Sequence, residues 1–110
     1  NTPDALKDGP FTSRPGAPCP DAPLGDGYLL DRLGGRFVLL CFNTLVPEGL
    51  DMPVVDLTGR IGPDLRDRYL GSANSAAYLV RPDQHVAARW TEANTTDIQN
   101  ARDRAMGHDQ

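Results

Sequence analysis

An uninterrupted apolar run, FVLLCF at residues 37–42, limits the folds open to this chain more than any other feature of its sequence. Its composition favours a β-strand, and its hydrophobicity is continuous rather than alternating. A strand with apolar side chains on both faces is covered on both, which is typical of the centre of a parallel or mixed sheet. The sequence therefore predicts an α/β domain built around a buried strand at this position.

A second stretch rich in β-formers lies at residues 76–90 and reads AAYLVRPDQHVAARW. Pro82 presets one backbone angle, and Asp83 can hydrogen-bond to its own downstream backbone, so the middle of the stretch predicts a turn. The flanking segments, residues 76–81 and 85–90, are then the two strands of a β-hairpin. Because both faces of this hairpin are largely apolar, we expect it to be covered on both sides.

Alternation along the hairpin predicts which side chains share a face. Tyr78 and Val80 fall on one face of the first strand, with Leu79 on the other. In the second strand, one face carries Val86, Ala88 and Trp90.

The other segments predict two helices and a short strand. Residues 43–53 contain two prolines and a glycine, which break any long helix, so we expect a turn that leads to a strand at residues 54–57. A helix is expected from the Gly-Pro-Asp at residue 62 to Gly71, with Leu65 and Tyr69 on its inner face. A last helix should follow a cap at residues 94–97. Its apolar stripe consists of Ile98, Ala101, Ala105 and Met106.

The amino-terminal part of the chain is rich in proline. Six of the ten prolines fall within residues 1–23, where they disfavour both helix and central strand. We therefore interpret residues 1–23 as an irregular arm or linker, residues 24–107 as the domain, and residues 108–110 as a frayed tail. Within the domain, residues 28–30 predict either the return arm of a small hairpin or a short helix.

Composition excludes several classes of function. The formal charge of -4, from 15 acidic and 11 basic residues, argues against binding to nucleic acid or to an anionic membrane. No run of about 18 apolar residues and no charged-then-apolar leader is present, so we expect a soluble protein. Cys19 and Cys41 fit no metal or CxxC spacing, which favours two free thiols in a reducing cytoplasm, although a bridge between them stays open.

The hairpin sequence also carries a resemblance. YLVRPD, followed by a hydrophobic residue, small residues and Arg-Trp, resembles the carboxyl-terminal segment of FAD-dependent aromatic-ring monooxygenases, of the phenol hydroxylase and 3-(3-hydroxyphenyl)propionate hydroxylase type. The segment RPGAPCPDAPL at residues 14–24 resembles the G-x-x-A-P-D-x-x-L motif that these tails share with peroxiredoxins, with Cys19 and Pro20 inserted.

The resemblance implies a trimmed thioredoxin-like fold, with a central mixed sheet of about four strands and flanking helices. It also implies a parent enzyme that uses FAD and NAD(P)H, in which upstream domains of the same polypeptide hold flavin and substrate. The partners that it implies are those domains and a homodimer partner, and the role that it implies for this chain is structural.

Few residues of the sequence are candidates for a catalytic or ligand-binding role. Cys41 lies within the apolar run, where burial raises a thiol pKa rather than lowering it. His85 beside the turn and His108 near the end have no patterned partner, and no glycine loop fits a phosphate-binding motif. We therefore predict no catalytic, cofactor-binding or metal-binding residue in this chain.

Four hairpin residues are candidates for an interface with another domain or subunit. Arg81 and Arg89 can form ion pairs with acidic residues of a neighbouring domain or subunit. Alternatively, they are solvated charges at the hairpin edge, where charge discourages edge-to-edge pairing of strands. Aromatic side chains can anchor an interface or belong to the core. The aromatic candidates are Tyr78 and Trp90.

The leading hypothesis is a non-catalytic structural or dimerisation domain of an FAD-dependent aromatic hydroxylase. The alternative is a free-standing, redox-inactive thioredoxin-like module that binds a partner protein. A third hypothesis, a one-cysteine peroxidase, would use Cys41 or Cys19.

Overall fold

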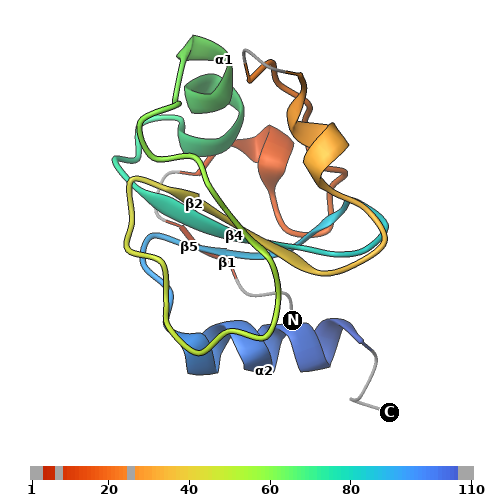
Figure 1. Ribbon diagram of the computed structural model, residues 1–110. Helices are drawn as coiled ribbons and strands as arrows, with labels where there is room; N and C mark the ends of the chain where they lie inside the picture. The colour runs from red at the N-terminus through yellow and green to blue at the C-terminus, as the bar shows by residue number, and fades with distance from the viewer. Residues whose placement is uncertain (1–3, 7–8, 25–26, 107–110) are drawn as a thin grey trace.

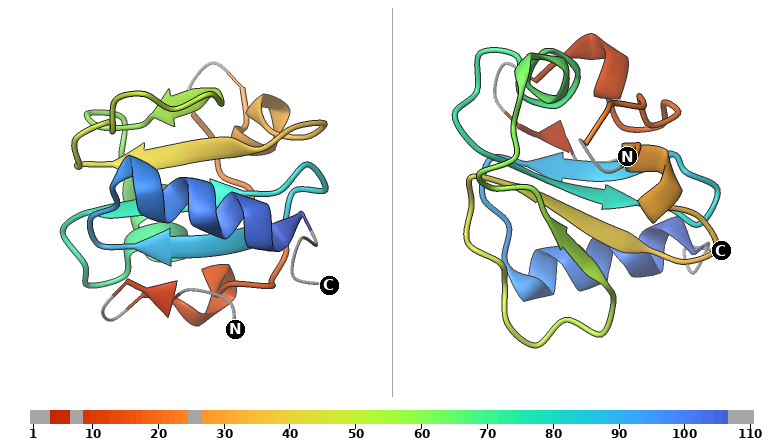
Figure 2. Two further views of the ribbon diagram at one scale, coloured as in Figure 1. Left: turned by 90° about the horizontal axis from the view of Figure 1, so that it is seen from below. Right: turned by 45° about the horizontal axis from the view of Figure 1, so that its top comes forward.

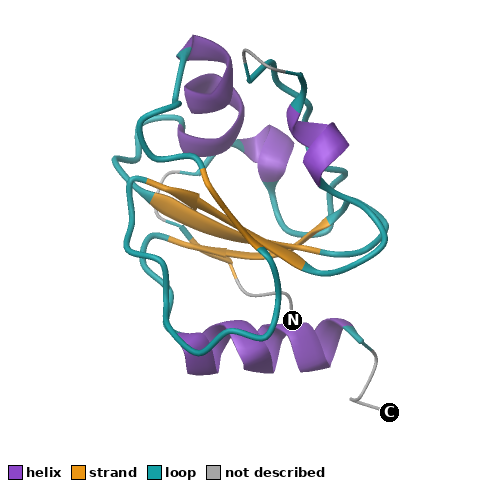
Figure 3. Cartoon of the chain, in the orientation of Figure 1, coloured by secondary structure: helices purple, strands orange, loops and turns teal. Residues whose placement is uncertain are grey.

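A computed structural model describes residues 4–6, 9–24 and 27–106 (Figure 1). Five strands form one mixed sheet, in the order β1-β5-β4-β2-β3. Helix α2 covers one face of the sheet, while the shorter helices gather on the other (Figures 1 and 3). The strands are β1 (Asp4–Ala5), β2 (Val38–Phe42), β3 (Val54–Asp56), β4 (Ala76–Val80) and β5 (Val86–Trp90).

Strand β2 confirms the expectation of a buried central strand. All five of its residues are buried, and it lies between β3, to which it is parallel, and β4, to which it is antiparallel. The connection from β2 to β3 contains no helix, as its prolines predict. The hairpin of β4 and β5 is also confirmed, and every residue of both strands is buried.

The shorter helices lie against the same face of the sheet as Tyr78, and all but η1 pack apolar side chains there. The expected helix after Gly62 begins with Pro63, and it ends at Gly71, where φ is +57°. Its predicted inner residues, Leu65 and Tyr69, are fully buried. The elements of this layer are η1 (Phe11–Ser13), η2 (Leu29–Arg32), α1 (Pro63–Leu65) and the π-helical turn η3 (Arg66–Leu70).

The segment around residue 28 combines both forms that its sequence predicts. Tyr28 makes an antiparallel bridge with Pro23, and the 3₁₀ helix η2 follows at once. The carboxylate of Asp21 accepts hydrogen bonds from the backbone N–H groups of Ala22 and Leu30, which ties the arm to the start of this helix.

Helix α2 (Thr95–Ala105) lies along the sheet on its other face (Figure 2). Its predicted cap is present, since the side chain of Asn94 accepts a hydrogen bond of 2.8 Å from the Asp97 backbone N–H. Ile98 and Ala101 are buried, as expected. The stripe is shorter than predicted, because the last turn of the helix lies in solvent; its exposed residues are Ala105 and Met106.

The amino-terminal arm is less irregular than its prolines predict. Strand β1 pairs in parallel with β5, so the sheet has a fifth strand beyond the four expected. Farther along the arm, Gly16 and Ala17 exchange backbone hydrogen bonds of 2.7 and 2.9 Å with Val86. The arm thus covers the outer edge of β5 at both ends. A domain boundary after residue 23 stays a prediction, and residues 1–3 and 107–110 lie outside the described part of the chain.

A β-bulge changes the predicted alternation in β5. Val80 pairs with Val86 and Leu79 with Ala88, which leaves Ala87 as the extra residue. Val86 consequently packs in the same cluster as Tyr78, whereas Ala88 and Trp90 pack beneath helix α2. The prediction that all three share one face is therefore wrong.

Candidate functional site

The carboxyl end of β2 is where the resemblance to thioredoxin-like domains would place a redox motif. Asn43 occupies this position, with φ at +55°. Its backbone N–H donates to the Thr58 hydroxyl at 2.9 Å, and its side-chain amide donates to the Asn74 carbonyl at 3.3 Å. Asn43 thus joins three loops at this end of the sheet. An amide in this role supplies no nucleophile.

Both cysteines are buried free thiols, as the sequence favours. Burial raises the pKa of Cys41 to about 11, and the nearby carboxylate of Asp56 adds to the effect. Burial likewise raises the pKa of Cys19 to about 12, against a smaller lowering by its hydrogen bond with Tyr69. Because the thiolate is the nucleophile in thiol catalysis, these surroundings argue against the one-cysteine peroxidase.

We expect both thiols to react at least ~100-fold more slowly with iodoacetamide in the folded chain than in urea, at about pH 8. A thiol with the ordinary pKa of 9.0 is about a tenth ionised there, whereas one with a pKa near 11 is ionised to roughly 0.1%. Mass spectrometry of the alkylated chain over time gives both rates. The matched control is Leu45→Cys, at a position 89% exposed, which should react at the rate of the unfolded chain. Equal rates at Cys41 and at the control would contradict the raised pKa.

A buried polar network links the arm to the hairpin through Arg89. The guanidinium donates to both carboxylate oxygens of Asp4, at 2.7 and 3.1 Å, and to the Pro10 carbonyl at 2.7 Å. A further hydrogen bond of 3.3 Å reaches the Ser13 hydroxyl. Gly9 lies so close that a Cβ there would be 2.8 Å from the Arg89 guanidinium carbon. The arm is thus fitted closely around this side chain.

The network continues from Ser13 into the core. The Ser13 and Tyr78 hydroxyls are 2.8 Å apart, and Tyr78 donates to the backbone carbonyl of Tyr69 at 2.5 Å. The Tyr69 hydroxyl in turn donates to the Pro20 carbonyl at 2.5 Å. The two tyrosine rings pack edge to face, and the Tyr69 ring also stacks on Phe42.

Burial and hydrogen bonding together set the protonation states of Tyr78 and Arg89 in this network. Burial raises the pKa of Tyr78, although its hydrogen bond with Ser13 and the charge of Arg89 oppose the rise. Burial alone would lower the pKa of Arg89, but the hydrogen bonds to Asp4 reverse this, and the pKa is raised. The guanidinium therefore stays charged and the phenol neutral at neutral pH. Such an arrangement holds the arm in place.

The structure places three of the four interface candidates inside the domain. Tyr78 is fully buried, and Arg89 and Trp90 are only 4% and 6% exposed. The arm and helix α2 cover these three side chains, so the folded domain leaves them little surface for contact with another protein. Arg81 is partly exposed and pairs with Asp83. Desolvation acts to raise the pKa of Asp83, but the hydrogen bond and the charge of Arg81 outweigh it, and the pKa is lowered. Arg81 is the most exposed of the four predicted interface residues.

One of the two histidines, His85, contacts the hairpin turn. His85 is half-buried, and its Nδ1 lies 3.0 Å from the backbone carbonyl of Asp83. His108 lies outside the described residues. Within the ranges 4–6, 9–24 and 27–106, no group of three or more His, Cys, Asp or Glu side chains gathers to hold a metal ion.

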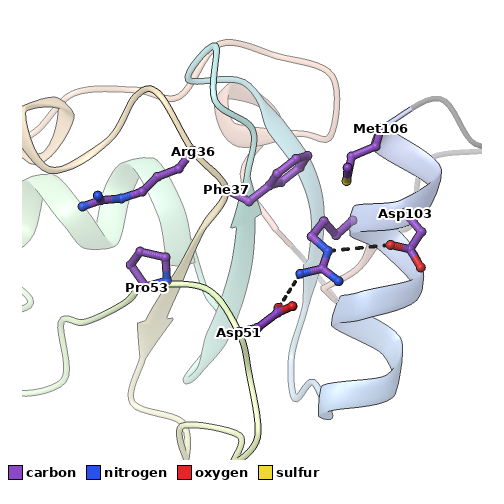
Figure 4. Close-up of a pocket in the computed structure, with 7 residues that line it drawn as sticks. Arg36, Phe37, Asp51, Pro53, Asp103 and Met106 are labelled. Carbon is purple, nitrogen blue, oxygen red and sulfur yellow. Dashed lines mark hydrogen bonds and ion pairs between the residues drawn. The ribbon is translucent and has the colours of Figure 1, made fainter.

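A shallow groove of about 420 Å³ lies between the carboxyl end of helix α2 and the segments that lead into β2 and β3 (Figure 4). Arg102 lines the groove and pairs with Asp51 and, at 3.7 Å, with Asp103. Its other lining residues are Arg36, Phe37, Pro53 and Met106. Three further grooves of similar size are present, and no glycine lines any of the four.

Sequence reasoning missed one surface feature, which we call the Leu45–Val46 ridge. Leu45 is 89% exposed and Val46 is 40% exposed, on the loop that follows β2. Two of the open grooves flank this ridge, one on each side. The signal in the sequence was a pair of adjacent apolar residues between the polar Asn-Thr and the Pro-Glu of an otherwise turn-like segment.

Comparison with known proteins gives matches among solved structures only. No protein-family model matches the chain, and no curated protein sequence matches it. None of the helices described is long and apolar enough to cross a membrane.

The matching structures are much longer than this chain. The flavin-dependent monooxygenase PieE, solved with FAD and substrate, is 26% identical at a TM-score of 0.63, over 87% of this chain and 20% of its own. RebC-10x with bound 7-carboxy-K252c is 30% identical at a TM-score of 0.61, over 86% of this chain and 19% of its own. The rebeccamycin biosynthetic enzyme RebC with reduced flavin is 27% identical at a TM-score of 0.60, over 92% of this chain and 18% of its own. The chain is thus similar to a segment that makes up about one fifth of each of these flavin enzymes, one of which is a flavin-dependent monooxygenase.

Proposed function

We propose that this chain is the non-catalytic, carboxyl-terminal, thioredoxin-like domain of an FAD- and NAD(P)H-dependent aromatic hydroxylase. The observation that carries the proposal is the match of almost the whole chain to about a fifth of each flavin enzyme, at 26–30% identity. A segment of that length is too short to hold both a dinucleotide-binding unit and a substrate domain. In this proposal, flavin and aromatic substrate are bound by upstream domains of the same polypeptide.

The order of elements supports the thioredoxin-like part of the proposal. A parallel pair, β2 and β3, is followed by a helix, an antiparallel hairpin and the final helix α2. The long helix that usually follows the first core strand is replaced here by the turn-like loop at residues 43–53. This trimming also removes the place where thioredoxin-type cysteines would be held.

Three features of the chain support a structural role. Both thiols have raised pKa values, the end of β2 carries Asn43, and no glycine lines the four grooves described above. The contacts of such a domain would be with the upstream domains or with a second subunit. Two free thiols are typical of a reducing compartment, which supports a cytoplasmic enzyme.

The test is the intact mass and visible spectrum of the native gene product, captured from its own cells with an antibody against this domain. We expect a yellow polypeptide about five times as long as this chain, in line with the 18–20% coverage of the solved structures. FAD added to the 110-residue chain alone should stay unbound in equilibrium dialysis.

A colourless product of 110 residues would instead favour the free-standing binding module. A yellow complex of FAD with the isolated chain would overturn the non-catalytic role, because the flavin site would then lie here.

A further inference from the structure

The Leu45–Val46 ridge exposes two adjacent aliphatic side chains. Single exposed apolar residues are ordinary on protein surfaces and need no explanation. Here the two lie side by side, and Leu45 keeps 89% of its surface exposed. In Figure 1 the loop that carries them leaves the end of β2 and runs down beside the first turn of helix α2.

The ridge is held at both ends of its loop. On one side, Asn43 donates from its backbone to the Thr58 hydroxyl and from its side chain to the Asn74 carbonyl. On the other side, the Thr95 hydroxyl at the start of helix α2 donates to the Glu48 carbonyl. A loop fixed in this way loses little conformational freedom when it binds, which is the condition for a preorganised contact surface.

The surroundings of the ridge are acidic. One flanking groove, of about 400 Å³, is lined in part by Glu48 and Glu92, and the other, of about 440 Å³, in part by Asp56. All three residues are exposed. No Lys or Arg of the described chain lines either groove. The ridge therefore presents an apolar centre with a carboxylate-bearing rim on both sides.

We propose that the Leu45–Val46 ridge docks into an apolar recess edged by Lys and Arg side chains on a partner protein surface. The apolar pair would fill the recess, and the carboxylates would face the basic edge and set the orientation of docking. The identity of the partner rests on the proposed function: the recess belongs to the flavin-binding part of the parent enzyme.

The experiment places the photocrosslinking residue p-benzoylphenylalanine at Leu45 in the native gene product, expressed in its own cells. The matched control carries it at Met106, which is 53% exposed and apolar but lies at the other end of helix α2. After irradiation, mass spectrometry identifies the peptide attached to each probe. We expect the probe at residue 45 to attach to one segment that combines apolar residues with Lys or Arg, at a yield well above the control.

A second variant tests the chemistry of the contact. With the probe moved to Val46, Leu45→Asp should reduce the yield of that attachment about tenfold or more, since a charge would enter an apolar recess. Folding should be unaffected because the residue is exposed, and circular dichroism checks this. Met106→Asp in the same background should leave the yield unchanged.

The outcomes separate this inference from the proposed function. Attachment to a basic, apolar segment of a protein that binds no flavin supports the docking ridge and overturns the hydroxylase assignment. Attachment to a flavin-binding region from residue 106 but not from residue 45 supports the assignment and overturns the ridge. Equal yields from both probes, or attachment to a segment without Lys or Arg, also overturn the ridge.

Discussion

Replacing Asp4 by alanine is expected to detach β1 from the sheet and to lower the free energy of unfolding by about 3 kcal/mol. The change leaves the Arg89 guanidinium, whose side chain is only 5% exposed, without its counter-charge. Removing one partner of a buried ion pair costs about 3–5 kcal/mol. We expect the lower end of that range because the Asp4 side chain is 42% exposed, so solvent already screens part of the interaction. Urea unfolding measures the loss.

Two further variants separate the unpaired charge from the lost packing. Arg89→Met removes the buried charge while keeping a long side chain, so the double variant with Asp4→Ala should be more stable than Asp4→Ala alone. The matched control is Arg81→Met, which removes an arginine from the exposed pair with Asp83 and should cost less than about 1 kcal/mol. A loss for Asp4→Ala no larger than that of the control would contradict a structural role for the buried pair.

Raising the pH above 9 is expected to unfold the chain. Four buried groups have raised pKa values: the thiols of Cys19 and Cys41, and the phenols of Tyr69 and Tyr78. The unfolded chain releases these protons near the ordinary values of 9.0 and 10.0, while the folded chain keeps them. The unfolded state therefore binds fewer protons, and the free energy of unfolding falls as pH rises from 9 through the folded thiol values of about 11 and 12.

The expected loss is on the order of 1 kcal/mol per pH unit for each group once that group is ionised in the unfolded chain. Over two pH units this reaches several kcal/mol, against a total stability of about 5–15 kcal/mol for an ordinary domain. Far-ultraviolet circular dichroism and tyrosinate absorbance, followed together in a Tyr28→Phe background that removes the exposed tyrosine, should change in one coincident transition. The variant Cys41→Ala should show a shallower dependence of stability on pH by about one proton. Ionisation of Tyr69 and Tyr78 while the dichroism stays native would contradict the prediction.

The central part of the fold could be predicted from the sequence because its signals are local. Continuous hydrophobicity identifies β2, and the Asn94 cap and the Gly71 stop mark the ends of two helices. The strand at residues 4–5 could not be found in the same way. Two residues have no periodicity, and these become a strand only because the free edge of β5 accepts them. The bulge at Ala87 likewise has no glycine or proline to signal it.

The candidate site was harder to predict than the fold, for a related reason. Arg81 and Arg89 look alike in the sequence, and each could be a solvated hairpin charge. Only the arm makes them different, since it brings Asp4, Pro10 and Ser13 to Arg89 from about 80 residues away. The ridge at Leu45 escaped prediction because hydrophobicity alone does not show whether a loop residue is buried.

The pairing of β1 with β5 has a consequence for the order of events during synthesis. Within this domain Asp4 leaves the ribosome early, but its partner Arg89 follows 85 positions later. Until then the arm has no strand to join, and its proline-rich segment must remain without its final contacts while β2, β3 and β4 emerge. The segment of this domain that is made first can thus complete its contacts only after β5 has emerged, and translation of the carboxyl-terminal half sets the moment at which the sheet is completed.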